Sequence, residues 1–279
     1  MIYIYTQFHP KSLCYLKNFI NSINREKISK TTNIKLIINF NQVKKKIKEL
    51  YKLKIPYEIY YTKKNQHYSR VKILKTILKN NFKILIFIDS DDLFYKNRIM
   101  GIVKNIKNYD FLVNNLILFP GKKKKIFFSL KDKKEIKLKD IYDKNFIGLS
   151  NLAISRKALI KSLNFKINKN LKAFDWMLAK IILLNKFNGV FCKNIYTLYR
   201  KYDHNVVSFK KNKAEFLKII NEKILHYKFF KNKIKKYKNE IKKLQILKKK
   251  IENKKLNKII YHYKKGEESF WWNLPKFNI

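Results

Sequence analysis

Short apolar runs and amphipathic segments alternate along the first third of the chain. Apolar runs of strand length occupy residues 2–6, 34–40, 57–62 and 84–88. The first two are each followed by a predicted helix, an amphipathic one over residues 10–25 and a Lys-rich one ending near Leu53. A third helix is predicted to begin at Ser69 as its N-cap. Strands that alternate with helices in this way predict an α/β fold with a mostly parallel sheet and helices on both faces.

The fourth apolar run leads directly into three carboxylates. Residues 84–88 are followed by Asp89, Ser90, Asp91 and Asp92. Ligands of open α/β sheets bind outside the carboxyl ends of the strands, and hard divalent cations such as Mg²⁺ and Mn²⁺ prefer carboxylate oxygens. The pattern therefore predicts a metal and phosphate site here; the structural alternative is a solvated turn in which an aspartate caps the next helix.

The rest of the chain continues the α/β pattern and then changes composition. A helix is expected over 97–107, a strand over 109–119, a basic turn at 120–125 and a surface excursion to residue 140. Further expected elements are a strand-like segment over 148–155, a helix from Arg156, an apolar helix over 173–185 and an extended segment from Gly189 to about 205. From Phe209 the chain is richer in Lys, so we predict a first domain over 1–208 and a helical extension over 209–279.

The extension carries a short apolar seam on a Lys-rich helix. Its members recur in steps of four and three residues, as in a coiled coil, and are Phe230, Ile234, Tyr237, Ile241 and Leu244. Lys248 occupies the next seam position. A helical hairpin and a homodimer through the tail are therefore both open, and Gly266 is expected to end the helices. The aromatic segment 269–275 is expected to pack on its own domain.

The charge of the chain is strongly positive, at +47, with 66 Lys and Arg residues against 19 Asp and Glu. Only five of the 66 are Arg, and the remaining 61 Lys accompany abundant Asn, Ile, Phe and Tyr, the set that A/T-rich codons encode. Lysines occur on every predicted helix and are not confined to one face of the molecule. We therefore do not expect nucleic acid to be the primary partner, although non-specific anion binding at low salt should occur.

Compartment signals favour a cytoplasmic protein. Cys14 and Cys192 have neither metal-site spacing nor a disulfide framework, and no apolar run approaches the length that spans a bilayer. The N-terminal residues lack the basic region and long apolar stretch of a signal peptide. The Lys-rich extension additionally suggests peripheral contact with an anionic membrane at its inner face.

Five segments, in order, resemble the family-2 glycosyltransferases of GT-A fold over about residues 1–208. The resemblance rests on Thr6-Gln7-Phe8-His9, Asn65 through Arg70, the Asp-x-Asp-like Phe87 to Asp92, Phe174-Asp175-Trp176, and Tyr199-Arg200 with His204-Asn205 and Ser208. Two positions depart from the family pattern. Asn39 stands where the family usually has an acid that reads the nucleobase, and Phe174 replaces the first acid of a Glu-Asp pair.

The resemblance implies an inverting transfer of sugar from a nucleotide-sugar donor to a hydroxyl of a glycan or lipid-linked acceptor, in surface glycan synthesis. It implies a divalent metal, Mn²⁺ or Mg²⁺, held by Asp91 with Asp89 and His204, and Asp175 as general base. The implied donor-binding residues are Thr6, Phe8, Asn39, Arg70, Asp89 and Arg200. For Asp175 the structural alternative is a carboxylate favoured by a helix N-terminus.

Two other function classes remain open from the sequence. One is a non-catalytic basic binding protein, for nucleic acid or anionic membrane, on a degenerate GT-A scaffold. The other is a nucleotidyltransferase, which is disfavoured because residues 6–10 contain no Gly for a phosphate loop.

Overall fold

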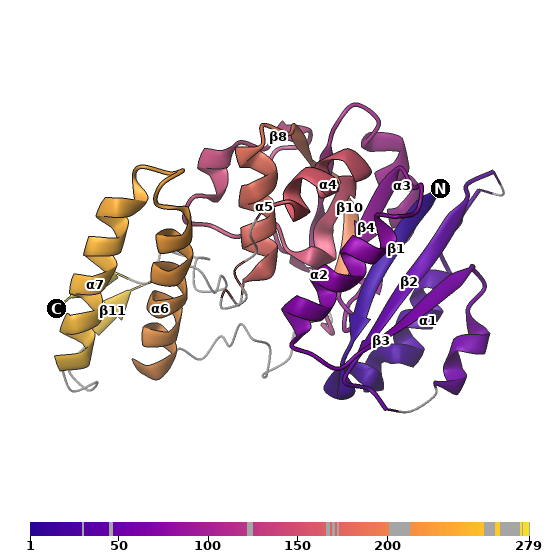
Figure 1. Ribbon diagram of the computed structural model, residues 1–279, viewed down its shortest axis with the longest axis horizontal. Helices are drawn as coiled ribbons and strands as arrows, with labels where there is room; N and C mark the ends of the chain where they lie inside the picture. Colours follow the sequence, from indigo (N-terminus) through magenta and orange to yellow (C-terminus); the bar gives the residue numbers. More distant parts are fainter. Residues whose placement is uncertain are drawn as a thin grey trace. The chain divides into compact units, whose positions relative to one another are not determined.

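The chain forms two units in a computed structural model (Figure 1). The described residues are 1–29, 31–44, 47–121, 125–165, 168, 171, 173–200, 213–253, 260–262, 274 and 276–278. The first unit comprises Met1–Ile141, Phe146–Ile167 and Leu178–Lys201, and the second comprises Tyr142–Asn145, Asn168–Met177 and Tyr202–Ile279. The predicted domain boundary at residue 208 falls outside the described residues and stays a prediction.

A ten-stranded sheet organises the first unit. Its strand order is β3-β2-β1-β4-β9-β6-β10-β5, with β7 paired to β6 and β8 paired to β10. The strands are β1 (Ile2–Phe8), β2 (Ile34–Asn41), β3 (Tyr57–Thr62), β4 (Ile84–Phe87), β5 (Leu93–Phe94), β6 (Phe111–Phe119), β7 (Lys125–Ile126), β8 (Lys134–Glu135), β9 (Leu152–Ser155) and β10 (Gly189–Arg200).

The direction of pairing brings several strand ends to one edge. β1 runs parallel to both β2 and β4, β2 runs parallel to β3, and β6 runs parallel to β10. β9 is antiparallel to β4 and to β6. The carboxyl ends of the first four strands therefore lie along the same edge of the sheet.

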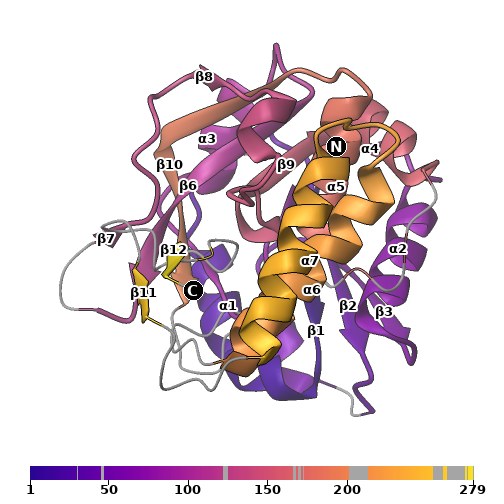
Figure 2. The same ribbon diagram turned by 90° about the vertical axis from the view of Figure 1, so that its left-hand side faces the viewer.

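Helices cover both faces of this sheet. The helices are α1 (Leu16–Asn24), α2 (Gln66–Ile77), α3 (Arg98–Asn105), α4 (Arg156–Leu163) and α5 (Phe174–Leu184); the 3₁₀ helices are η1 (Pro10–Tyr15), η2 (Lys48–Lys52), η3 (Leu138–Ile141) and η4 (Leu149–Asn151). Figure 2 shows α1 and α2 on opposite sides of β1 to β3.

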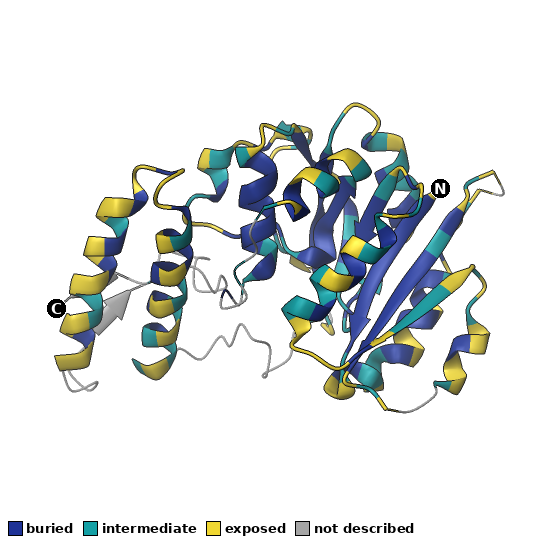
Figure 3. Cartoon of the chain, in the orientation of Figure 1, coloured by how far each residue is buried: buried dark blue, intermediate teal, exposed yellow. Residues whose placement is uncertain are grey.

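The alternation of side chains along β1 explains this arrangement. Ile2, Ile4 and Phe8 belong to the same buried cluster as Phe19 of α1 and Ile99 of α3. In a strand the intervening residues point to the other face, so β1 is apolar on both sides and must be covered twice. Figure 3 shows the central strands buried, the edge strand β3 mostly intermediate, and the outer sides of the helices exposed. The predicted α/β class is confirmed.

Two predicted helix details are wrong. α2 is capped by Asn65, whose side chain accepts from the backbone N–H of His67 at 2.9 Å, whereas Ser69 lies one turn inside the helix and is fully buried. The described part of the Lys-rich stretch before Leu53 contains the short 3₁₀ helix η2 in place of the predicted α-helix, and Leu50 of η2 belongs to the core cluster.

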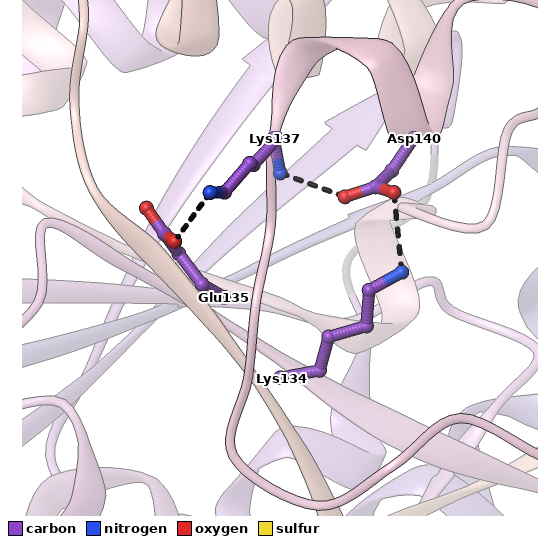
Figure 4. Close-up of polar contacts among 4 residues, drawn as sticks. All are labelled: Lys134, Glu135, Lys137 and Asp140. Atoms are coloured by element: carbon purple, nitrogen blue, oxygen red, sulfur yellow. Dashed lines mark hydrogen bonds and ion pairs between the residues drawn. The ribbon is translucent and has the colours of Figure 1, made fainter.

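The predicted surface excursion carries its own charge pairs, which Figure 4 shows. Asp140 accepts from Lys134 Nζ at 3.2 Å and from the backbone N–H of Lys137 at 2.9 Å. The Lys137 ammonium in turn lies 3.1 Å from Glu135. These contacts fix β8 against η3.

The second unit contains a helical hairpin. Its elements are α6 (Lys213–Phe230), α7 (Tyr237–Asn253) and an antiparallel pair, β11 (Ile260–His262) and β12 (Lys276–Asn278). α6 and α7 lie side by side, as Figure 2 shows. The predicted seam is therefore not one continuous helix: Phe230 ends α6, Ile234 lies in the turn and Tyr237 begins α7. Gly266 and residues 269–273 lie outside the described residues.

Among the described residues, none of the helices is both long enough and apolar enough to cross a membrane.

Candidate functional site

The carboxyl edge of the first unit gathers several of the predicted site residues. Gln7 and Asn39 are register partners at the ends of β1 and β2, and Tyr5 is the partner of Phe87 at the end of β4. The Ile88 backbone N–H donates to Tyr5 O at 3.1 Å, which extends the pairing to the last residue before Asp89. The sheet topology thus places the three carboxylates beside the polar end of β1.

The acidic turn, residues 89–92, is tied down at its first member. Asp89 donates its backbone N–H to Ser150 Oγ at 3.0 Å, and the Ser150 hydroxyl lies 3.2 Å from Asp89 Oδ2. The Asp92 N–H donates to Asp89 O at 3.2 Å and closes the turn. Asp89 and Asp91 are partly exposed, whereas Asp92 is buried.

Asp92 carries the electrostatic cost of this arrangement. Burial, followed by the nearby carboxylates of Asp91 and Asp89, holds the pKa of Asp92 well above its ordinary value. Its Oδ1 accepts from the Arg200 N–H at 2.7 Å, while Oδ2 is buried with no hydrogen-bond partner among the described residues. The turn therefore disfavours a further negative charge at Asp92.

Arg200, at the end of β10, is joined to this turn. Its Nε donates to Asp91 O at 2.8 Å, and its guanidinium carbon lies 4.4 Å from the ring centres of both Tyr15 and Phe119. Two residues predicted for one site, 109 positions apart in sequence, are thus in direct contact.

The carboxylates of the turn suit a hard divalent cation. The described residues contain no group of three or more His, Cys, Asp or Glu side chains that would hold a metal ion by themselves. Mg²⁺ and Mn²⁺ are, however, commonly held by one or two carboxylates together with substrate phosphates. Asp89 and Asp91 are partly exposed and the buried Asp92 oxygen is unpaired, so the residues fit a cation shared with a phosphate ligand. His204 lies outside the described residues.

A cluster of neutral polar side chains lies at the ends of β1, β2 and β3. Asn39 is fully buried; its Nδ2 donates to Gln7 Oε1 at 3.1 Å and its Oδ1 accepts from Thr62 Oγ1 at 2.9 Å. The Tyr5 hydroxyl donates to the same Gln7 oxygen at 3.0 Å. Both ends of the Asn39 amide are thus bonded within the protein.

The other predicted donor-binding residues vary in accessibility. Thr6 and Phe8 are fully buried, and Phe8 packs edge-on against Phe19 in the core. Arg70 is partly exposed on α2 and lies near Tyr5, where burial raises the pKa of the Tyr5 phenol to about 12 although Arg70 lowers it. The donor-binding roles of these residues stay predictions.

Three residues to which the sequence analysis assigns no role also belong to this region. His9 is close enough to Asp91 for that carboxylate to raise its pKa, although burial lowers the pKa of His9 overall. Ser150 binds Asp89 as described, and its carbonyl oxygen accepts from Arg98 Nη2 at 2.9 Å. The available signal for Arg98 is its type: it is one of only five arginines in a chain of 61 lysines.

Asp175 belongs to the second unit, in the first turn of α5. Its Oδ1 accepts from the Trp176 N–H at 2.8 Å and its Oδ2 accepts from Asn145 Nδ2 at 3.2 Å. Phe174 and Trp176 on either side are buried, and Asp175 itself is partly exposed. A carboxylate that is oriented by hydrogen bonds and flanked by aromatic residues is suited to accept a proton, and it equally suits a helix N-terminus.

No protein-family profile and no curated protein sequence matches the chain. Among solved structures it is similar to residues 1–349 of TarS from S. aureus in complex with UDP-GlcNAc, at 15% identity and a TM-score of 0.61, covering 81% of this chain and 66% of that one. A longer TarS structure gives a TM-score of 0.57, with 39% of that chain covered.

A mannosyltransferase is also similar in fold. PcManGT from Pyrobaculum calidifontis, solved with GDP-Man and Mn²⁺, gives 9% identity and a TM-score of 0.52, covering 81% of this chain and 62% of that one. The chain thus spans less than two thirds of each of these three chains, from 39% to 66%. The likeness confirms the predicted GT-A-like fold with its helical tail.

Proposed function

We propose that the chain is a glycosyltransferase, similar to the family-2 enzymes, that moves a sugar from a nucleotide-sugar donor to an acceptor hydroxyl with inversion. The observation that carries the proposal is the contact of Arg200 with the acidic turn at the carboxyl edge of a GT-A-like sheet. A cationic side chain and carboxylates gathered at this edge are the groups that a metal-bound diphosphate requires. The solved neighbours with UDP-GlcNAc and with GDP-Man and Mn²⁺ support the same substrate class.

The donor half of the site comprises the acidic turn and the basic residues near it. Asp91 and Asp89, with His204, would hold the divalent cation, which when bound stabilises the charge of the departing diphosphate as a Lewis acid. Arg200 and Arg70 would contact the donor. Since Asn39 is neutral and both ends of its amide are occupied, we infer that the nucleobase is not read by a carboxylate here.

The acceptor half depends on Asp175. In a direct displacement the acceptor oxygen forms its bond to the anomeric carbon while the bond from that carbon to the diphosphate oxygen breaks. The proton of the hydroxyl goes to the Asp175 carboxylate, which Asn145 orients. One base and one displacement leave no covalent intermediate, and the product is inverted. The proposed acceptor hydroxyl belongs to a glycan or to a lipid-linked acceptor in surface glycan synthesis.

Two substitutions test this assignment separately. Purified protein is titrated with UDP- and GDP-sugars in the presence of Mn²⁺, and transfer or slow hydrolysis is followed by release of the nucleotide. Asp91→Ala should abolish donor binding and turnover, whereas Asp175→Asn should leave donor binding intact and abolish transfer. Asp140→Ala, which removes a carboxylate from the excursion of Figure 4, is the matched control and should leave both unchanged. Full turnover in Asp91→Ala would refute the metal role.

A second candidate is a non-catalytic basic binding protein on the same scaffold, which the charge of +47 favours. It predicts tight binding to nucleic acid or anionic vesicles that persists at physiological salt, with no metal-dependent affinity for nucleotides. Metal-dependent donor binding in the titration above would exclude it as the main function.

We further propose that the helical hairpin contacts an anionic membrane, where lipid-linked acceptors reside. A groove of about 780 Å³ runs between α6 and α7. Its lining includes Leu225 and Ile246, which are 43% and 58% exposed, together with the acid Glu252 and four lysines: Lys228, Lys242, Lys248 and Lys249. Exposed aliphatic side chains among lysines are typical of surfaces that bind acidic lipid.

A further inference from the structure

Arg98 is completely enclosed by the first unit. It is the first residue of α3 and is 1% exposed. Its Nη2 donates to Phe87 O at 2.8 Å and to Ser150 O at 2.9 Å, and its Nε donates to Asn114 Oδ1 at 3.2 Å. One planar group therefore joins the end of β4, the 3₁₀ helix η4 and the middle of β6.

The segments that Arg98 joins are those that hold the acidic turn. Phe87 precedes Asp89 by two residues, and Ser150 bonds to both the backbone and the carboxylate of Asp89. The Thr197 hydroxyl donates to Ser150 O at 2.8 Å and accepts from Asn114 Nδ2 at 3.0 Å. A closed network of polar groups thus links Arg98 to Asp89.

The charge of Arg98 also bears on the turn. Burial lowers the pKa of Arg98 to about 10, while Glu26, Asp92 and Asp89 raise it, so the guanidinium remains protonated at neutral pH. Burying a cation is costly unless its hydrogen bonds and nearby charges compensate. Here main-chain carbonyls, Asn114, Glu26 and the carboxylates of the turn supply the compensation, while Arg98 Nη1 has no hydrogen-bond partner among the described residues.

We propose that Arg98 is a positioning residue of the donor site: its guanidinium fixes the carbonyls of Phe87 and Ser150, and through Ser150 it orients the Asp89 carboxylate for the metal-bound diphosphate. This inference rests on the proposed function for its ligand. The positioning itself does not, because the network exists in the protein alone. A lysine in this place would keep the charge but lose the planar fork that reaches three acceptors at once.

The test compares Arg98→Lys with Arg156→Lys. Arg156 donates to Leu78 O at 2.8 Å and to Asn80 O at 3.2 Å, and so makes the same kind of fork to main-chain carbonyls after α2. Mn²⁺ binding is measured by electron paramagnetic resonance of the free ion. Arg98→Lys should weaken Mn²⁺ binding about ten-fold or more, as expected for loss of a group that orients a metal ligand, and Arg156→Lys should leave it unchanged.

Hydrogen–deuterium exchange of the peptide covering residues 88–93 provides a readout that needs no metal. Arg98→Lys should increase exchange in this peptide and Arg156→Lys should not. If Arg98→Lys fails to fold, Ser150→Ala takes its place as the test. It removes the hydroxyl that bonds Asp89, and it should likewise increase exchange in this peptide. Unchanged exchange and unchanged Mn²⁺ affinity in a folded Arg98→Lys or Ser150→Ala variant would overturn the inference. Absence of Asp91-dependent Mn²⁺ binding in the wild type would instead refute the proposed metal role, and the exchange result would still decide the positioning.

Discussion

Arginine and lysine have separate uses in this molecule. Most lysines among the described residues are exposed, whereas Arg98, Arg156 and Arg200 each donate to main-chain carbonyls from partly or fully buried positions. A guanidinium offers five donors in a fixed plane, while an ammonium is a compact and strongly hydrated charge. In a chain whose composition favours lysine, these three arginines lie where a guanidinium bonds main-chain acceptors.

The first prediction concerns Arg200→Lys. The substitution removes the Nε bond to Asp91 O and the stacking of a planar cation between Tyr15 and Phe119. Loss of one charged hydrogen bond of about 1.5–3 kcal/mol corresponds to roughly ten-fold or greater weakening of nucleoside diphosphate binding in the presence of Mn²⁺. Isothermal titration with UDP and GDP measures it. Equal affinities for the variant and the wild type would show that Arg200 only supports the turn.

The second prediction concerns the pH dependence that Glu26 imposes on stability. Glu26 Oε2 accepts from the Ile99 N–H at 2.8 Å, in the first turn of α3, and burial raises the pKa of Glu26 above its ordinary value. The folded state then binds the proton more tightly than the unfolded state. Its free energy of unfolding therefore falls as the pH rises from the unfolded-state pKa, about 4.5, through the raised value, and is level above it.

Glu26→Gln keeps an acceptor for Ile99 and removes the ionisation. The variant should lack this fall, and at neutral pH it should be at least as stable as the wild type, because burial of the charge outweighs its favourable place at a helix N-terminus. Urea unfolding of both proteins over the range from about pH 4 to pH 7 measures the difference. A variant that is less stable than the wild type at pH 7 and parallel to it at all pH values would contradict the argument.

At the residue scale, the sequence predicts a group when its type and its place in an element both point to chemistry. Asp89, Asp91 and Arg200 satisfied this condition, because each follows or ends a predicted strand. Arg98 and Ser150 did not, since the hydrogen bond between them spans 52 positions of the sequence, and no local pattern contains it. For Asn39 the position at the end of a strand was predictable from the sequence. The hydrogen bonds of its two amide atoms with Gln7 and Thr62 were not.

Helix ends illustrate the same limit at the element scale. α2 and α3 both follow an Asn, but only Asn65 bonds to the first turn of its helix, whereas Asn97 has a φ of 59° and makes no capping bond. The first turn of α3 is instead bonded by Glu26, from a distant part of the chain. Sequence alone cannot distinguish a local cap from one supplied by a neighbouring element.

The third prediction separates these two asparagines. Asn65→Ala removes the acceptor of the His67 N–H and should lower the free energy of unfolding by about 1 kcal/mol. Asn97→Gly removes no bond and relieves a left-handed backbone conformation, so it should leave stability unchanged or slightly raised. Chemical unfolding of both variants checks the contrast, and equal losses at the two sites would refute the assignment of the cap.

The helical hairpin shows how packing decides what a periodic pattern becomes. The seam residues from Phe230 to Leu244 follow a coiled-coil spacing, and no Gly or Pro interrupts them. The chain nevertheless turns after Phe230, which lets Tyr227 stack on Tyr237 with ring centres 4.1 Å apart. Two aromatic residues ten positions apart cannot meet on one straight helix, so the turn buries area that a continuous helix would leave exposed.

Charge acts at the scale of the whole molecule. With 66 basic and 19 acidic residues, the chain attracts any polyanion, so weak binding at low salt carries little information about function. A specific binding surface is distinguished by binding that persists when the salt concentration is raised. The groove between α6 and α7 is such a candidate because Leu225 and Ile246 add apolar contact to its lysines.

The last prediction therefore compares apolar and charged changes on this hairpin. Leu225→Ser with Ile246→Ser should reduce binding to phosphatidylserine vesicles about ten-fold or more at physiological salt. Only the exposed half of each side chain remains to be buried, so the pair should contribute about 1.5–3 kcal/mol in total. Ile126→Ser, at an apolar side chain of the first unit that is 40% exposed, is the matched control and should have no effect.

Lys242→Glu with Lys249→Glu should weaken binding and flatten its salt dependence more than the same reversal at the exposed Lys17 and Lys131. Vesicle co-sedimentation over a salt series measures all four variants. If both reversals weaken binding equally and the apolar changes do nothing, the attraction belongs to the net charge of the chain and the hairpin has no specific membrane surface.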